Sequence, residues 1–150
     1  MKFQTLKFSD LSYKLWEKVS ALTIPDSGLT RYYNYFLDAI DDNDQERQDK
    51  NDLSLILVSD PDLCAWSMVG LDQDYYDGHS AVVYIFIKKS HRKQGLGVEI
   101  FSKTLEICAK QGFKNFNVYA HDSASKAFFE SSKIQELVKA ANLTMSIIES

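Results

Sequence analysis

The chain of 150 residues has little cysteine, little histidine and no long apolar run. Its two cysteines, Cys64 and Cys108, lie far apart in a predicted strand and a predicted helix, so we expect small core residues in a reducing compartment and no disulfide. The three scattered histidines exclude a metal motif of short spacing. No apolar stretch approaches a membrane span, and the first residues lack the apolar region of a signal peptide. We therefore expect a cytoplasmic protein without a membrane partner or a metal.

An excess of positive charge is also missing. The formal net charge is −4, and no long basic stripe is present, which argues against nucleic acid as a partner. Apolar residues make up 45% of the chain and charged residues 25%, both typical of a globular protein. Nine Phe and eight Tyr argue against extensive disorder. The length fits one domain spanning residues 1–150.

The hydrophobic pattern predicts the element order β-α-α-β-β-β-α-β-α-β. The strands flanking the third helix, 81–87 and 116–120, should be parallel, whereas the earlier hairpins should be antiparallel. An α/β (α+β) fold follows, with a mixed, mostly antiparallel sheet and helices on both faces. The other predicted strands are 2–8, 53–58, 63–71 and 143–148, and the predicted helices are 9–22, 29–40, 97–111 and 122–141 with a break at 131–132.

Two details of the helices follow from their sequences. Ser9 or Asp10 is expected to cap the first helix, and Asp122 or Ser123 the helix after the fifth strand. That later helix is expected to turn three apolar residues inward, namely Ala124, Ala127 and Phe128.

Two acidic segments, 41–52 and 72–77, lie between predicted elements. Most such runs are solvated connections. The alternative is that they attract a cationic substrate.

The most informative segment begins with the apolar run 82–87 and continues into a basic turn with Gly95 and Gly97 before an amphipathic helix. A strand, a glycine turn and a helix in this order present backbone N–H groups to a phosphate. Glycine also allows a ligand to approach the main chain closely. The alternative is a basic connection without a ligand. Positive charge in the turn comes from Lys88, Lys89, Arg92 and Lys93.

With this element order, the chain resembles the GNAT N-acetyltransferase superfamily over essentially its whole length. The segment Arg92-Lys93-Gln94-Gly95-Leu96-Gly97 fits the acyl-CoA motif Q/R-x-x-G-x-G/A of that family, between its fourth strand and third helix. The segment 122–130, Asp-Ser-Ala-Ser-Lys-Ala-Phe-Phe-Glu, resembles the N-x-x-A-x-x-F-Y-E stretch after its fifth strand.

The resemblance implies acetyl-CoA, or another acyl-CoA, as the cofactor. Backbone amides at 93–98 would hold the pyrophosphate, main-chain groups at 86–88 would pair with the pantetheine arm, and the helix after the fifth strand would flank the thioester. Asp122 stands where the family often has Asn, and its expected role is helix capping. The cofactor-binding residues implied are Phe86, Ile87, Lys88, Arg92, Lys93, Gln94, Gly95, Leu96, Gly97, Val98, Asp122, Ser125 and Phe129.

The resemblance further implies direct attack of an amine on the thioester, but it leaves the proton carriers open. Phe129 stands where many members have a Tyr that serves as the acid, and the strand 81–87 has no carboxylate. Three side chains are candidates: Tyr84, Tyr119 and His121. Each has an ordinary alternative, a packed tyrosine or a solvated histidine, and a water chain can also move the proton.

Two functions of different class therefore fit the sequence. The first is an N-acetyltransferase that acts on a primary amine of a cationic small molecule, a peptide or a protein. The second is an acyl-CoA-binding module without turnover, a sensor or an interaction domain, which Phe129 favours because its side chain has no hydroxyl group. Another phosphorylated ligand in the same turn is a third option. Pairing through the final strand, as in relatives, would make a homodimer.

Overall fold

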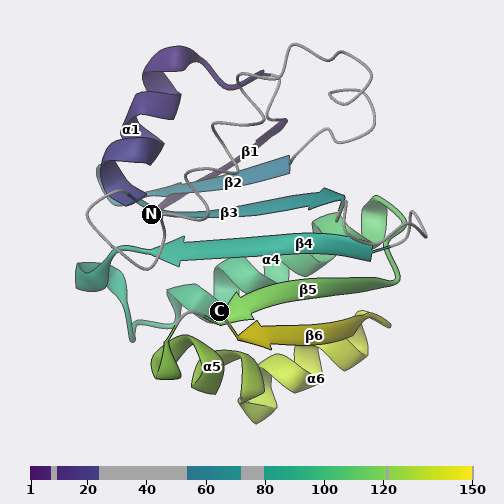
Figure 1. Ribbon diagram of the computed structural model, residues 1–150. Helices are drawn as coiled ribbons and strands as arrows, with labels where there is room; N and C mark the ends of the chain where they lie inside the picture. Colours follow the sequence, from purple (N-terminus) through teal and green to yellow (C-terminus); the bar gives the residue numbers. More distant parts are fainter. Residues whose placement is uncertain (8–9, 24–53, 72–79, 121, 150) are drawn as a thin grey trace.

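The computed structural model describes residues 1–7, 10–23, 54–71, 80–120 and 122–149 (Figure 1). Several sequence-based predictions lie outside these residues: the helix at 29–40, both acidic segments and His121. Within the described part, no helix is long and apolar enough to cross a membrane.

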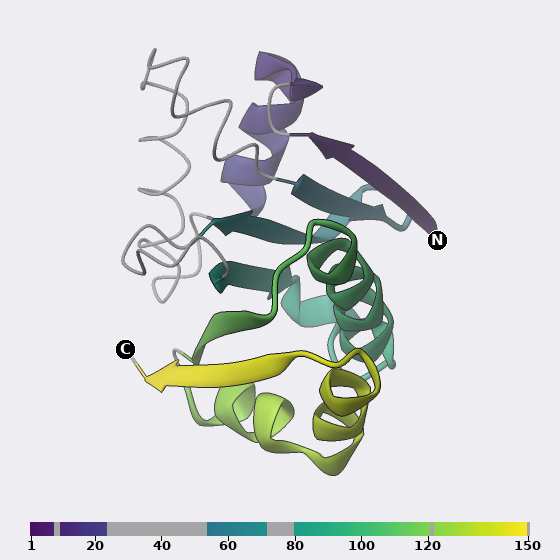
Figure 2. The ribbon, with the colours of Figure 1, turned by 90° about the vertical axis from the view of Figure 1, so that its right-hand side faces the viewer.

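Within the described residues, six strands form one sheet in the order of the chain, from β1 at one edge to β6 at the other (Figure 2). The first four pair antiparallel, whereas β4, β5 and β6 run parallel to one another. The predicted fold class is thus confirmed, including the parallel pair around the glycine turn and its helix. The strands are β1 (Lys2–Lys7), β2 (Ser54–Ser59), β3 (Leu63–Leu71), β4 (Ser80–Ile87), β5 (Asn115–Ala120) and β6 (Thr144–Glu149).

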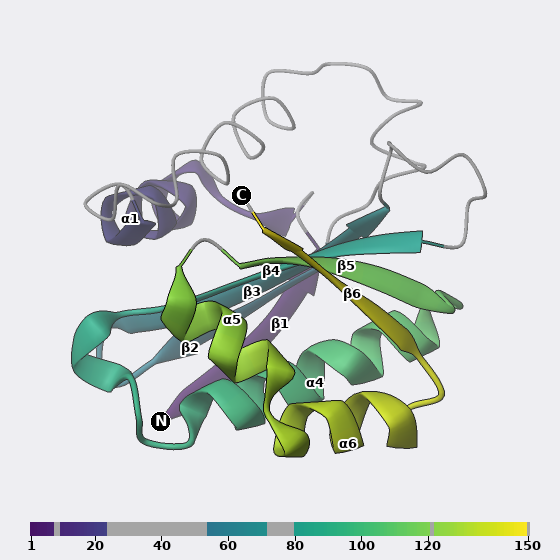
Figure 3. The ribbon, with the colours of Figure 1, turned by 60° about the horizontal axis from the view of Figure 1, so that its bottom comes forward.

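Helices cover both faces of the sheet, because neighbouring residues of each buried strand point to opposite sides. Helix α1 (Tyr13–Thr23) lies on one face, and α4 (Leu96–Lys110), α5 (Ser123–Glu130) and α6 (Ser132–Ala140) lie on the other (Figure 3). The α1 face buries Val19 with Trp66 and Met68. The opposite face buries Phe101, Leu105 and Cys108 of α4, Phe116 of β5, and Ile134 and Val138 of α6.

The helix caps follow local chemistry, with one correction. The N–H of Leu15 donates to Oγ of Ser12 at 3.2 Å, so Ser12 caps α1, and the prediction of Ser9 or Asp10 was wrong. Asp122 caps α5, as predicted. The predicted break before α6 is also confirmed, since Ser131 separates the two helices and its Oγ accepts the N–H of Ile134.

The inward face of α5 differs from the prediction. Phe129 is buried and Phe128 is half-buried, while Ala124 and Ala127 are exposed. Residues four apart share a helix face, so turning Phe129 inward brings Ser125 to the same side and carries Ala127 to the opposite one. The prediction that both alanines face inward was therefore wrong.

Both cysteines are free thiols buried in the core, as expected of small core residues. Burial raises the pKa of the Cys108 thiol to about 12, so it remains neutral at physiological pH.

Candidate functional site

The connection from β4 to α4 has an unusual backbone. A short 3-10 turn, η3 (Lys89–His91), leads into a loop in which Lys93 has φ of 64° and Gly95 has φ of 79°. Left-handed backbone is uncommon for a residue with a side chain, and it costs about 1–2 kcal/mol. Turns that mix left- and right-handed residues direct successive N–H groups into one concavity, which suits an anion. Residues 92–95 are called the anion loop below.

The first turn of α4 continues this concavity. Gly95 is its N-cap and provides no side-chain hydrogen bond, whereas Asp122 and Ser131 cap α5 and α6 with their side chains. The first N–H groups of a helix have no partner within the helix, and together they carry a partial positive charge. A helix that begins at a glycine leaves those groups to a ligand.

Arg92 brings a formal positive charge to the anion loop. Its Nε donates to the carbonyl of Ile87 at 2.8 Å, which holds the guanidinium group at the end of β4. Both Arg92 and Lys93 line the cavity described next. A guanidinium and an ammonium group at this place favour an anionic ligand.

A cavity of about 420 Å³ opens beside the anion loop. Its wall comes from β4, the anion loop, the start of α4, the end of β5 and α5. The lining residues are Val83, Ile85, Phe86, Ile87, Arg92, Lys93, Gly95, Gly97, Val98, Tyr119, Asp122, Ala124, Ser125, Phe128 and Phe129.

The cavity lies where β4 and β5 separate. Their parallel ladder ends at the pair Val83–Val118, although β4 continues to Ile87. The N–H of Lys88 donates to the carbonyl of Cys64 on β3 at 2.8 Å. Main-chain groups alternate in direction along a strand, so those of Ile85 and Ile87 face away from β3, toward the gap. The gap therefore has a strand edge along one side.

Side chains from both faces of the sheet meet in this cavity. Phe86 and Tyr119 belong to the core cluster on the α1 face, whereas Phe128 and Phe129 pack with the cluster on the α4 face. A ligand bound at the anion loop can thus extend between the strands toward the opposite face.

Helix α5 forms an aromatic wall of the cavity. Phe129 is only 6% exposed, and its ring centroid lies 5.3 Å from that of Phe128 and 6.0 Å from that of Phe101. A Cβ added at Gly97 would lie 3.0 Å from the ring of Phe128. A side chain at Gly97 would therefore press on the ring of Phe128, so glycine suits the close packing of the start of α4 on α5.

The carboxylate of Asp122 is already used by the helix. It accepts the N–H of Ser125 at 2.7 Å and the hydroxyl of Ser125 at 2.8 Å, which completes a capping box. The capping role expected of Asp122 is confirmed. No other carboxylate belongs to the part of the cavity wall that the described residues form.

The structure brings most of the predicted cofactor residues together, with three exceptions. Leu96 is buried in the core, Gln94 donates to the carbonyl of Ser90 at 3.4 Å, and Lys88 points its N–H toward β3. Residue-level reasoning missed Val83, Ile85, Ala124 and Phe128 as lining residues. Strand alternation next to Ile87 was a signal for Ile85, but the position of α5 was not readable from the sequence.

Of the predicted proton carriers, the structure places Tyr119 in the cavity wall, where it is 8% exposed. Tyr84 stacks on it with a centroid distance of 5.5 Å but is not part of the wall. His121 lies outside the described residues. Among those residues, no group of three His, Cys, Asp or Glu side chains could hold a metal.

Comparison with known proteins agrees with this geometry. The model of the acetyltransferase (GNAT) family matches residues 16–132. The chain is similar in fold to a GNAT-family acetyltransferase from Staphylococcus aureus Mu50, with 12% identity, a TM-score of 0.53, and coverage of 85% of this chain and 81% of the other. A similar structure is an aminoglycoside acetyltransferase from an uncultured soil metagenomic sample, solved with sisomicin, with 14% identity, a TM-score of 0.50, and coverage of 93% and 86%. No curated protein matches in sequence.

Proposed function

Because the chain belongs to the acetyltransferase (GNAT) family, we propose that it transfers an acetyl group from acetyl-CoA to a primary amine by direct attack on the thioester. The observation that carries the proposal is the cavity in the gap between β4 and β5, with the anion loop beside it. A small molecule, a peptide or a protein would provide the amine. Positioning of the two reactants would supply much of the acceleration.

We infer that an acyl-CoA binds at the anion loop and extends into the cavity. Backbone N–H groups of residues 93–95 and of the first turn of α4 would hold the pyrophosphate, with charge from the side chains of Arg92 and Lys93. The main chain of Ile85 and Ile87 would pair with the amides of the pantetheine arm as a neighbouring strand does. Ser125 and Phe129 on α5 would flank the thioester. When bound, acetyl-CoA supplies an activated acetyl group.

Tyr119 is the proton carrier that we propose for this site. Phe129 has no hydroxyl, and the Asp122 carboxylate is bound to Ser125. Tyr119 has a phenol, and the residue lines the cavity wall. A phenol can donate a proton to a departing thiolate.

We expect Tyr119→Phe to lower kcat about tenfold, below the range typical of an acid–base group, because water can also supply a proton to a thiolate. The affinity for CoA should change less than twofold, because the ring and its stacking on Tyr84 remain. Tyr84→Phe is the matched control, since it removes a phenol from the neighbouring ring outside the wall. Steady-state rates and calorimetry measure both quantities. If Tyr119→Phe and Tyr84→Phe have the same kcat, Tyr119 is not the proton donor, and water supplies the proton to the thiolate.

The proposed activity is tested by release of free thiol. The protein is incubated with acetyl-CoA and a panel of small amines, peptides and proteins, and the rate is compared with that without enzyme. Thiol release that depends on one class of amine supports the proposal. CoA binding without thiol release across the panel would instead favour an acyl-CoA-binding module without turnover, the alternative suggested by the absent hydroxyl at Phe129.

A further inference from the structure

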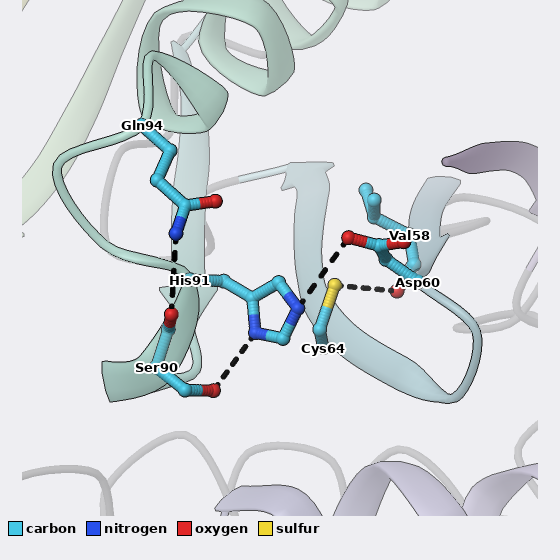
Figure 4. A network of polar contacts seen from close by, with 6 residues as sticks. All are labelled: Val58, Asp60, Cys64, Ser90, His91 and Gln94. Atoms are coloured by element: carbon cyan, nitrogen blue, oxygen red, sulfur yellow. Dashed lines mark hydrogen bonds and ion pairs between the residues drawn. The ribbon is translucent and has the colours of Figure 1, made fainter.

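The anion loop is connected to a hairpin that does not line the cavity. The side chain of His91, at the end of η3, points toward the β2–β3 turn (Figure 4). Its Nε2 lies 3.6 Å from Oδ2 of Asp60, and its Nδ1 lies 2.9 Å from Oγ of Ser90. The imidazole is 19% exposed and the Asp60 carboxylate 45% exposed. This pair joins two segments that are distant in the sequence.

The hairpin holds η3 at both of its ends. At the first end, the N–H of Lys88 donates to the carbonyl of Cys64 at 2.8 Å. At the other end is the contact of His91 with Asp60. The turn that carries Asp60 is itself fixed, because the thiol of Cys64 donates to the carbonyl of Val58 at 3.5 Å (Figure 4). Burial raises the pKa of this thiol, which keeps it a donor.

Polar contacts matter here because, among the described residues, buried side chains flank the anion loop on its C-terminal side alone. On its C-terminal side, Leu96 and Ile100 of α4 are buried in the core. On its N-terminal side, η3 has no buried residue. Lys93 nevertheless adopts a left-handed conformation between the two sides. Such a conformation persists only where the surrounding structure holds it.

We propose that Asp60 and His91 form a clamp that positions the anion loop for the pyrophosphate of an acyl-CoA, an inference that rests on the function proposed above. Both are positioning residues, because neither lines the cavity. The clamp keeps η3 against the hairpin. The N–H of Arg92 donates to the carbonyl of Lys89 at 3.3 Å, so η3 in turn orients the N–H groups of residues 93–95. Its loss should therefore weaken binding of the phosphate end of the ligand and leave the pantetheine end unaffected.

The test uses Asp60→Ala and His91→Ala, with CoA binding measured by calorimetry. We expect the dissociation constant to rise about fivefold in each, equivalent to about 1 kcal/mol, the upper range for a partly exposed polar pair. The double variant should bind CoA no more weakly than the single variants, because either change breaks the same contact. Asp62→Ala is the matched control, since it removes an exposed carboxylate from the same turn without removing the Asp60–His91 pair.

A second ligand separates positioning from general loss of structure. S-acetylpantetheine lacks the pyrophosphate, and its binding, followed by NMR titration, should be the same in the wild-type protein and in all variants. The clamp is contradicted if Asp60→Ala binds CoA as Asp62→Ala does, or if both ligands weaken equally. Failure of the wild-type protein to bind CoA would instead contradict the proposed function.

Discussion

A Gly95→Val variant should lose about a hundredfold of its affinity for CoA. Gly95 has φ of 79°, a conformation that is a strong outlier for a β-branched residue. Relaxing it would rotate the N–H groups at the start of α4 away from their common concavity. Each hydrogen bond to a charged oxygen contributes about 1.5–3 kcal/mol, so losing one or two accounts for the effect. Calorimetry with CoA measures it.

Gly112→Val is the control for this prediction. Gly112 follows the other end of α4, has φ of 83°, and, like Gly95, has open space where a Cβ would stand. Both substitutions should therefore lower the melting temperature by similar amounts, because the backbone cost is the same. Only Gly95→Val should weaken CoA binding. If both variants bind CoA equally well, the anion loop is not the phosphate site.

A Phe101→Ala variant should lose about 3–5 kcal/mol of unfolding free energy, the range for removing a buried aromatic ring. Phe101 is fully buried on α4, and its ring centroid lies 6.2 Å from those of Phe116 and Phe128 and 6.0 Å from that of Phe129. The side chain does not line the cavity, but it supports the two α5 rings that do. CoA affinity should therefore fall as well. Urea unfolding and calorimetry measure the two effects.

Leu55→Ala is the control for Phe101→Ala. It tests whether the lower CoA affinity of Phe101→Ala comes from displacement of the α5 rings or from lower stability. Leu55 is fully buried in the cluster on the α1 face, away from α5, and its truncation should cost about 2–5 kcal/mol. Compared at a temperature at which both variants are folded, Leu55→Ala should bind CoA like the wild-type protein. Equal loss of affinity in both variants would contradict a supporting role for Phe101.

The elements that the sequence predicted correctly depend on neighbours in the chain. The apolar run of β4, the glycine at the start of α4 and the Asp122 cap are local signals, because caps and helix starts involve residues within one turn. The cap of α1 was predicted too early in the chain, because α1 begins at Tyr13, after Ser12. The error in α5 arose because tertiary packing determined which of its faces is buried. Ala124 and Ala127 have the same apolar character as inward residues, but burial of Phe129 set the rotation of α5.

The role of Gly97 illustrates the same division. The sequence places it in an acyl-CoA motif and predicts close approach of a ligand. In the structure, the atom that a Cβ at Gly97 would meet first belongs to Phe128, which lies 31 residues later in the sequence and on another helix. Which neighbour a side chain at Gly97 would meet depends on how α4 and α5 pack, so no local pattern could identify it.

The sequence alone determined the family, the mixed sheet and the place of the anion loop, because these follow from hydrophobic period and a short motif of adjacent residues. Tertiary structure alone decided where the β4–β5 ladder ends, and hence where the cavity lies and that Tyr119 lines it. It also brought Asp60 to His91. The physical reason is that strand register and the contacts between hairpins arise from the packing of distant segments, which no local pattern specifies.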